Sequence, residues 1–112
     1  MNAPLLNRKL VLEHAVQTAD GSGGYSENWV ALGTLWADIS AGAGSEKAGE
    51  FITVSSVPYR ITVRAAPVGA QSRPKPDQRF VEGTRIYRIK AVTERDAQAH
   101  YLTCYAYEEE AS

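Results

Sequence analysis

The amino-acid sequence predicts an all-β protein, a small antiparallel β-barrel of five to six strands with long loops. Short runs in which apolar and polar residues alternate recur along the chain, and this alternation is typical of half-buried strands. No run shows a convincing helical period. Parallel strands need long, usually helical, crossovers, so the strands are expected to be antiparallel. A single domain of 112 residues would close such a sheet into a barrel or a sandwich, which protects its edge strands.

The chain begins with a short arm, residues 1–7, in which Pro4 does not fit a central strand. The next run, residues 8–17, alternates and is predicted to form the first strand, although His14 interrupts its apolar face. The apolar face comprises Leu10, Leu12 and Val16, and the opposite face comprises Lys9, Glu13 and Gln17.

A glycine cluster, Asp20-Gly21-Ser22-Gly23-Gly24, separates the first strand from the second. Glycine permits positive φ without steric cost, so this cluster predicts the turn of a long-looped β-hairpin. The second strand is predicted over residues 33–40, and residues 25–31 either extend it or belong to the loop. Both tryptophans lie on this side of the turn. Trp29 is expected to help close the hairpin, and Trp36 to anchor the barrel or a subunit contact.

Three further strands are expected in the second half of the chain, and a β-branched run before Pro58 is another candidate. In the run over residues 84–92, one face is expected to carry Tyr87, Ile89 and Ala91. An acidic tail is expected over residues 108–112. The candidate run and the three strands are residues 51–57, 59–65, 84–92 and 101–107.

Two connections are too long for a simple small barrel, residues 40–57 and residues 66–80. Structureless loops longer than about 12 residues are usually functional or disordered, so function is expected in these loops rather than in the strands. The first is rich in glycine and small residues, which favours a flexible segment.

Composition and motifs argue against an enzyme and against a dedicated DNA-binding domain. The formal net charge is −1, whereas DNA-binding domains are usually basic. The glycine cluster lacks the Lys-Ser/Thr pair of a phosphate-binding loop. His14 and His100 are far apart, and Cys104 lies on the apolar face of a strand, where a buried thiol is expected. We therefore predict no catalytic, cofactor-binding or metal-binding residues.

The single cysteine permits no intramolecular disulfide, and the N-terminus shows no signal-peptide pattern. No apolar run is long enough for a membrane span. The protein is expected to be made in the cytoplasm.

Several basic residues share strand faces or gather in the second long loop. They either form ordinary solvated faces or line a surface that contacts nucleic acid or a partner subunit. They are Arg60 and Arg64, Arg88 and Lys90, and Arg73, Lys75 and Arg79. Tyr101, Tyr105 and Tyr107 could supply stacking surfaces beside them, or pack against a neighbour.

The order of these landmarks resembles the head closure proteins of tailed bacteriophages, which are also called head–tail joining or stopper proteins. The resemblance extends over about residues 5–106. The residues that carry it are Leu6-x-Arg8, the glycine cluster, Trp29, Trp36-Ala37-Asp38-Ile39, Gly44-x-Glu46, Tyr59-x-Ile61-x-Val63-Arg64, Arg73, Gly83-x-Arg85-x-Tyr87-x-Ile89 and Leu102-x-Cys104.

The resemblance implies a structural protein that forms a homo-oligomeric ring of six or twelve copies in the neck of a phage, prophage or gene transfer particle. Such a ring lies below the portal or its adaptor ring. It closes the double-stranded DNA channel after packaging, and it docks the tail terminator or tail tube. No membrane is involved.

The resemblance also assigns roles to residues. The loop over residues 40–57 would close the channel, and Arg64, Arg73 and Arg85 would make subunit or channel contacts. The glycine turn would be a projecting tip that touches a neighbouring ring. The residues chosen in the channel loop are Glu46, Lys47, Gly49 and Glu50. Two other functions remain open: a small OB-type barrel that binds single-stranded nucleic acid, and a β-sandwich interaction module.

Overall fold

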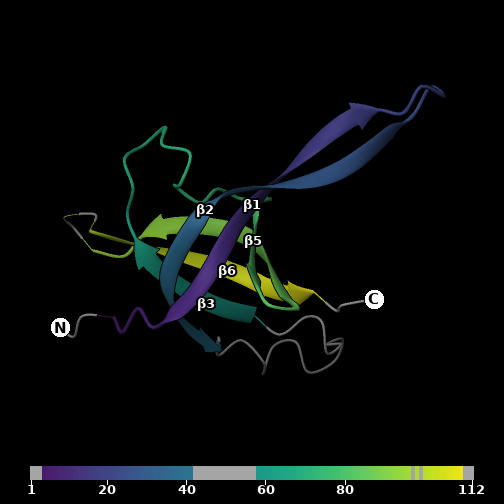
Figure 1. The fold of residues 1–112 in the computed structure, drawn as a ribbon. Coiled ribbons are helices and arrows are strands. Elements are labelled where there is room, and N and C mark those ends of the chain that lie inside the picture. Colours follow the sequence, from purple (N-terminus) through teal and green to yellow (C-terminus); the bar gives the residue numbers. More distant parts are fainter. Residues whose placement is uncertain (1–3, 42–57, 97, 99, 110–112) are drawn as a thin grey trace, which may run out of the picture.

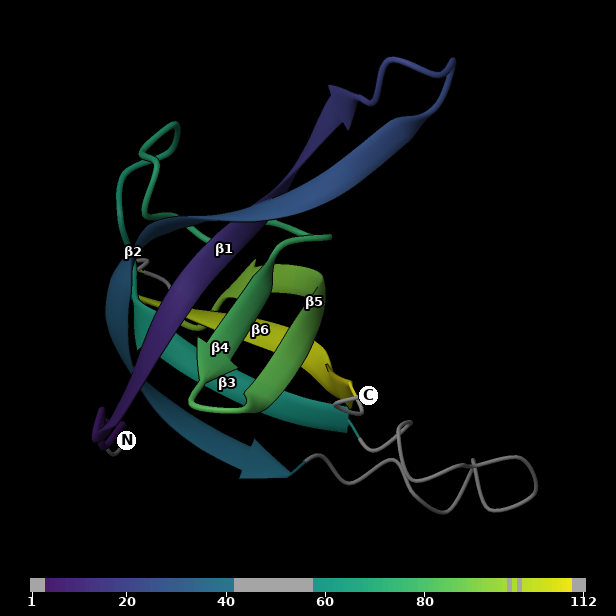
Figure 2. The same cartoon turned by 45° about the vertical axis from the view of Figure 1, so that its right-hand side comes forward.

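The computed structural model describes residues 4–41, 58–96, 98 and 100–109, and in this part the chain is all-β. Six antiparallel strands form a closed barrel in the order β1-β2-β3-β6-β5-β4, which confirms the predicted fold class (Figures 1 and 2). The strands are β1 (Arg8–Ala19), β2 (Tyr25–Ala41), β3 (Pro58–Arg64), β4 (Arg79–Glu82), β5 (Arg85–Glu94) and β6 (Tyr101–Glu109).

Strand β4 closes the barrel by pairing with β1, with Leu12 opposite Phe80. The sequence pattern does not predict this strand, and residues 79 and 80 were expected in the second long loop. Four residues are too few to show a strand pattern, although Phe80 is fully buried. Gly83 turns β4 into β5 with φ of 61°, a backbone conformation that favours glycine.

The core fills the inside of the barrel with one residue in two from each strand. The side chains of Leu10 and Leu12 point inward, as do those of Ile61 and Val63, and all four are fully buried. This is the alternation expected of strands with one solvated face. The other buried core residues are Ala37, Phe80, Tyr87, Ile89, Leu102, Cys104 and Ala106.

The hairpin of β1 and β2 is longer than predicted, and β2 includes residues 25–31. A register shift between Leu12 and Glu13 leaves Leu32 as an extra residue on β2, and Leu32 packs against the core. A bulge of this kind bends the strands and increases their twist. Beyond it the hairpin leaves the barrel, so the prediction that Val16 belongs to the buried face was wrong: Val16 is 37% exposed.

Strands β5 and β6 also differ from the prediction. A second register shift, between Ile89 and Ala91, leaves Ala91 exposed and packs Val92 against the core. Glu108 and Glu109 were expected in an acidic tail, but they continue β6 and pair with β5.

The N-terminal arm is tied to the barrel by the backbone N–H of Leu5, which donates to Asp38. The long loop beyond Ala41, the candidate strand over residues 51–57 and the residues Glu46, Lys47, Gly49 and Glu50 lie outside the described residues. Within the described ranges, no helix has the length and apolar character needed to cross a membrane.

Candidate functional site

A long hairpin arm, residues 14–30, projects away from the barrel (Figures 1 and 2). Strand β4 pairs with β1 only as far as Glu13, and β3 pairs with β2 only from Ala37 onward. Within the described residues the two strands of the arm therefore pair only with each other. Isolated two-stranded ribbons are marginally stable in water, so a surface of this shape is suited to contact another molecule.

The tip of the arm is held by Asp20. Its Oδ1 accepts hydrogen bonds from the backbone N–H groups of Ser22, at 2.8 Å, and Gly24, at 3.1 Å. Gly21 and Gly23 have φ of 84° and 86°, which a side chain would strain. A Cβ on Gly24 would lie 3.0 Å from the Asp20 carboxylate. The sequence of the turn thus specifies a compact tip at the end of the arm.

Trp29 fixes the base of the arm against the barrel. The guanidinium carbon of Arg79 lies 4.1 Å from the centre of the Trp29 ring system, and that of Arg88 lies 5.2 Å from it. These two arginines face each other across β4 and β5, where like charges repel. The indole face and two carboxylates offset that repulsion: Glu13 lies 2.8 Å from Arg79, and Glu109 lies 3.4 Å from Arg88.

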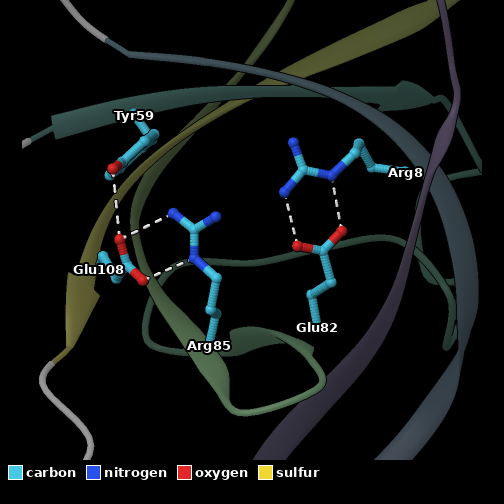
Figure 3. A network of polar contacts seen from close by, with 5 residues as sticks. All are labelled: Arg8, Tyr59, Glu82, Arg85 and Glu108. Carbon is cyan, nitrogen blue, oxygen red and sulfur yellow. Dashed lines mark hydrogen bonds and ion pairs between the residues drawn. The ribbon is translucent and has the colours of Figure 1, made fainter.

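One end of the barrel is closed by inward-facing charges. Arg8, Glu82, Arg85, Tyr59 and Glu108 lie two residues along their strands from buried core residues, so they share the inward face. Figure 3 shows two arginine–carboxylate pairs beside each other at this end.

In the first pair, Arg8 donates from Nε and Nη2 to Glu82, at 2.7 and 2.6 Å. In the second, Arg85 donates to both oxygens of Glu108, at 2.8 and 3.0 Å, and the Tyr59 hydroxyl donates to the same carboxylate at 3.2 Å. Two-point contacts of this kind are among the stronger charge-assisted hydrogen bonds.

These pairs change the acidity of their members. The hydrogen bond from Arg8 lowers the pKa of Glu82, and the hydrogen bond from Arg85 lowers the pKa of Glu108. The same contacts raise the pKa of Arg8 and of Arg85. All four groups are therefore charged at neutral pH, and together they close the barrel interior with no net charge.

The structure does not bring together the three arginines chosen for subunit or channel contacts. Arg85 is engaged at the charged end of the barrel. Arg73 donates to the Ala66 carbonyl at 2.7 Å and lies 4.0 Å from Glu94, whereas Arg64 is exposed and lies over the Tyr101 ring. Arg64 and Arg73 both border the segment that follows β3. Arg64 lies at the opposite end of β3 from Tyr59 and the two arginine–carboxylate pairs.

An apolar pocket of about 300 Å³ lies beside Trp36, which is 53% exposed. Its walls come from the N-terminal segment before β1, from β2 and from the segment after β3. Arg64 and Ser72 supply polar groups. Trp36 and Arg64 are among the site residues predicted from the sequence, whereas their neighbours Leu6, Ala65 and Ala66 are not. Those small and aliphatic residues are brought together only by the fold.

A second groove crosses the outer face of β2, β3 and β6 and includes Asp38, Arg60 and Tyr105. It mixes acidic, basic and hydroxyl groups, which is not the uniformly basic surface typical of nucleic-acid binding. Within the described ranges, no group of three or more His, Cys, Asp or Glu residues could hold a metal ion.

Comparisons with known proteins agree with this architecture. A family model described as phage head completion protein matches residues 1–110. A chain in the virion of a native gene transfer agent particle is 60% identical, with a TM-score of 0.80, over 98% of this chain and 100% of that chain. Protein SF1141 from Shigella flexneri 2a has the same fold at 22% identity, with a TM-score of 0.71 and full coverage of both chains. No curated protein matches the chain significantly.

Proposed function

This chain belongs to the phage head completion protein family, and we propose that it forms a ring at the junction between head and tail. A structural head–tail role and a virion location follow from the family, as the resemblance predicted. The proposed ring holds six or twelve copies and lies between the portal or adaptor ring and the tail terminator or tail tube. The observation that carries this proposal is the family match over nearly the whole chain.

The relative in a gene transfer agent particle supports a phage-like particle of that kind as the host of this chain. The family is a structural one, and we propose no catalytic activity. The projecting arm and the apolar pocket beside Trp36 provide contact surfaces of the kind that a connector needs on more than one side.

We further propose that the ring closes the DNA channel after packaging, through the connection between β2 and β3. This role is inferred from the sequence of that connection, with Glu46, Lys47, Gly49 and Glu50 as its chosen residues. The last residue of β2, Ala41, pairs with Tyr59 near the start of β3, and the Tyr59 hydroxyl donates to Glu108. The connection therefore begins and ends at the same end of the barrel as the two arginine–carboxylate pairs.

Deleting residues 42–50 tests the channel function directly. Particles with this deletion are expected to contain the protein but to lose packaged DNA, measured as nuclease-sensitive DNA after purification. A matched variant replaces the same nine positions with glycine and serine, which keeps the length and removes the side chains. If the deleted particles retain DNA and join tails as the parent does, the channel role is wrong.

The test of the ring itself is the copy number of the chain in purified particles, obtained by imaging of the head–tail junction. Six or twelve copies with rotational symmetry are expected. A single copy at each junction would contradict the proposal.

A further inference from the structure

The arm has a surface that the proposed channel role does not use. Cross-strand partners share a face, and one face of the arm carries the pairs His14–Val30, Val16–Asn28 and Thr18–Ser26. Val16 is 37% exposed and Val30 is 45% exposed. This face is free of carboxylates and of lysine and arginine, and it lies opposite the face that carries the pairs Gln17–Glu27 and Ala19–Tyr25.

The face with Gln17–Glu27 and Ala19–Tyr25 carries an aromatic anchor close to the tip of the arm. Tyr25 is 71% exposed and pairs with Ala19 next to the glycine turn. A tyrosine combines a large apolar area with a polar end, which makes it one of the residue types that dominate protein–protein contacts. The arm also contains acidic residues, Asp20 and Glu27, but no lysine or arginine over residues 14–30.

The pocket beside Trp36 complements the face of the arm that carries Tyr25 and Glu27. Its walls include Leu6, Leu35 and the exposed Trp36, and an exposed guanidinium, Arg64, stands at the same site. Within the described residues, β3 pairs with β2 only from Ala37, so β2 has an open edge over Thr34–Trp36 beside this pocket. An open edge offers backbone hydrogen-bonding groups to an added strand.

We propose that the arm of one copy docks on this pocket in the next copy of the chain. Tyr25 enters the pocket against Trp36, and Glu27 lies near Arg64. The face of the arm with Tyr25 and Glu27 and the pocket with its guanidinium lie on different surfaces of the same chain, so the contact is heterologous. Repeating such a contact around an axis generates a ring if the rotation closes. The proposal rests on the ring described above and identifies the surfaces that build it.

Cross-linking tests which surfaces meet. Particles are prepared with Ser22→Cys, at the exposed tip beside Tyr25, and Ser72→Cys in the same chain and treated with a short bismaleimide. Cys104 is fully buried, so the two introduced thiols are the reactive ones. A ladder of covalent multimers is expected. The matched control pairs Ser22→Cys with Thr84→Cys, an exposed position at the charged end of the barrel, and is expected to give no ladder.

Charge reversal tests the specificity of the contact. Glu27→Arg and Arg64→Glu are each expected to reduce the yield of multimers, and a loss of roughly tenfold corresponds to a disrupted central contact. The double variant Glu27→Arg with Arg64→Glu is expected to restore much of that yield. Both positions are exposed, so neither change should unfold the barrel, which circular dichroism verifies.

The outcomes separate this inference from the ring. Several copies at each junction without a Ser22–Ser72 cross-link would overturn the docking contact and leave the ring intact. An equal ladder in the Thr84 control, or single reversals with no effect, would also overturn it. A single copy at each junction would contradict both.

Discussion

Replacement of Trp29, which contacts two arginines at the base of the arm, gives the sharpest prediction about stability. Trp29 is half-buried at the base of the arm and contacts two guanidinium groups, Arg79 at 4.1 Å and Arg88 at 5.2 Å. Each cation–π contact contributes about 0.5–2 kcal/mol, depending on its exposure to water. Its removal also leaves two arginines opposite each other without the indole that both contact.

Trp29→Ala is therefore expected to lower the free energy of unfolding by about 3 kcal/mol. Two contacts of about 1 kcal/mol each make up most of this loss, and lost apolar burial adds about 1 kcal/mol because the side chain is only partly buried. Trp29→Leu keeps apolar bulk without the aromatic face, so its expected loss is about 2 kcal/mol. Urea denaturation followed by far-ultraviolet circular dichroism measures these changes, since tryptophan fluorescence itself changes with the substitution.

Trp36→Ala is the matched control because Trp36 is 53% exposed on the same strand. Its expected cost to the free energy of unfolding is below about 1 kcal/mol. If Trp29→Ala and Trp36→Ala destabilise the protein equally, or if Trp29→Ala costs less than about 0.5 kcal/mol, the role assigned to the arginine–tryptophan cluster is wrong.

The remaining predictions concern the charged end, the core and one turn. The folded pKa values of Glu82 and Glu108 lie below their ordinary value of 4.5, so their contribution to stability is present above that pH and is lost as the pH falls below it. Acid titrations should show this loss in the parent, whereas Glu108→Gln should weaken the dependence; an unchanged profile would contradict the pairing. Burial raises the pKa of Cys104 to about 12, so this thiol should resist Ellman's reagent at pH 8 in the folded protein and react in urea. Gly83→Ala should cost about 1 kcal/mol, because φ of 61° strains a residue with a Cβ even though the space is open; equal stability in urea would refute this.

Strand alternation was sufficient to predict much of the fold. The runs around Leu10, Ile61 and Leu102 each follow a period of two over most of their length, and each supplies buried side chains to the core. The all-β class, the antiparallel pairing and the closed barrel were therefore predictable. Bulges were not, because one extra residue such as Leu32 reverses the faces of every residue beyond it and leaves no mark in composition.

The candidate site was less predictable than the fold. Arg85 was selected as a contact residue because a family pattern contains it, but its partner Glu108 was read as part of a tail. The signal that could have found the pair is parity: Arg8 precedes Leu10, and Arg85 precedes Tyr87, by two positions, so both had to face inward. The pocket beside Trp36 depends on contacts between distant segments, and no local pattern encodes those.

The packed interior of the barrel has a consequence for any passage of DNA. Side chains such as Phe80 and Tyr87 fill its centre, and two arginine–carboxylate pairs close one end, so a duplex cannot thread a single subunit. In the proposed ring, a bore wide enough for DNA would then be bounded by the outer walls of several subunits. The width of that bore would depend on the number of subunits in the ring and on the angle between neighbouring subunits. It would not depend on the diameter of a single barrel.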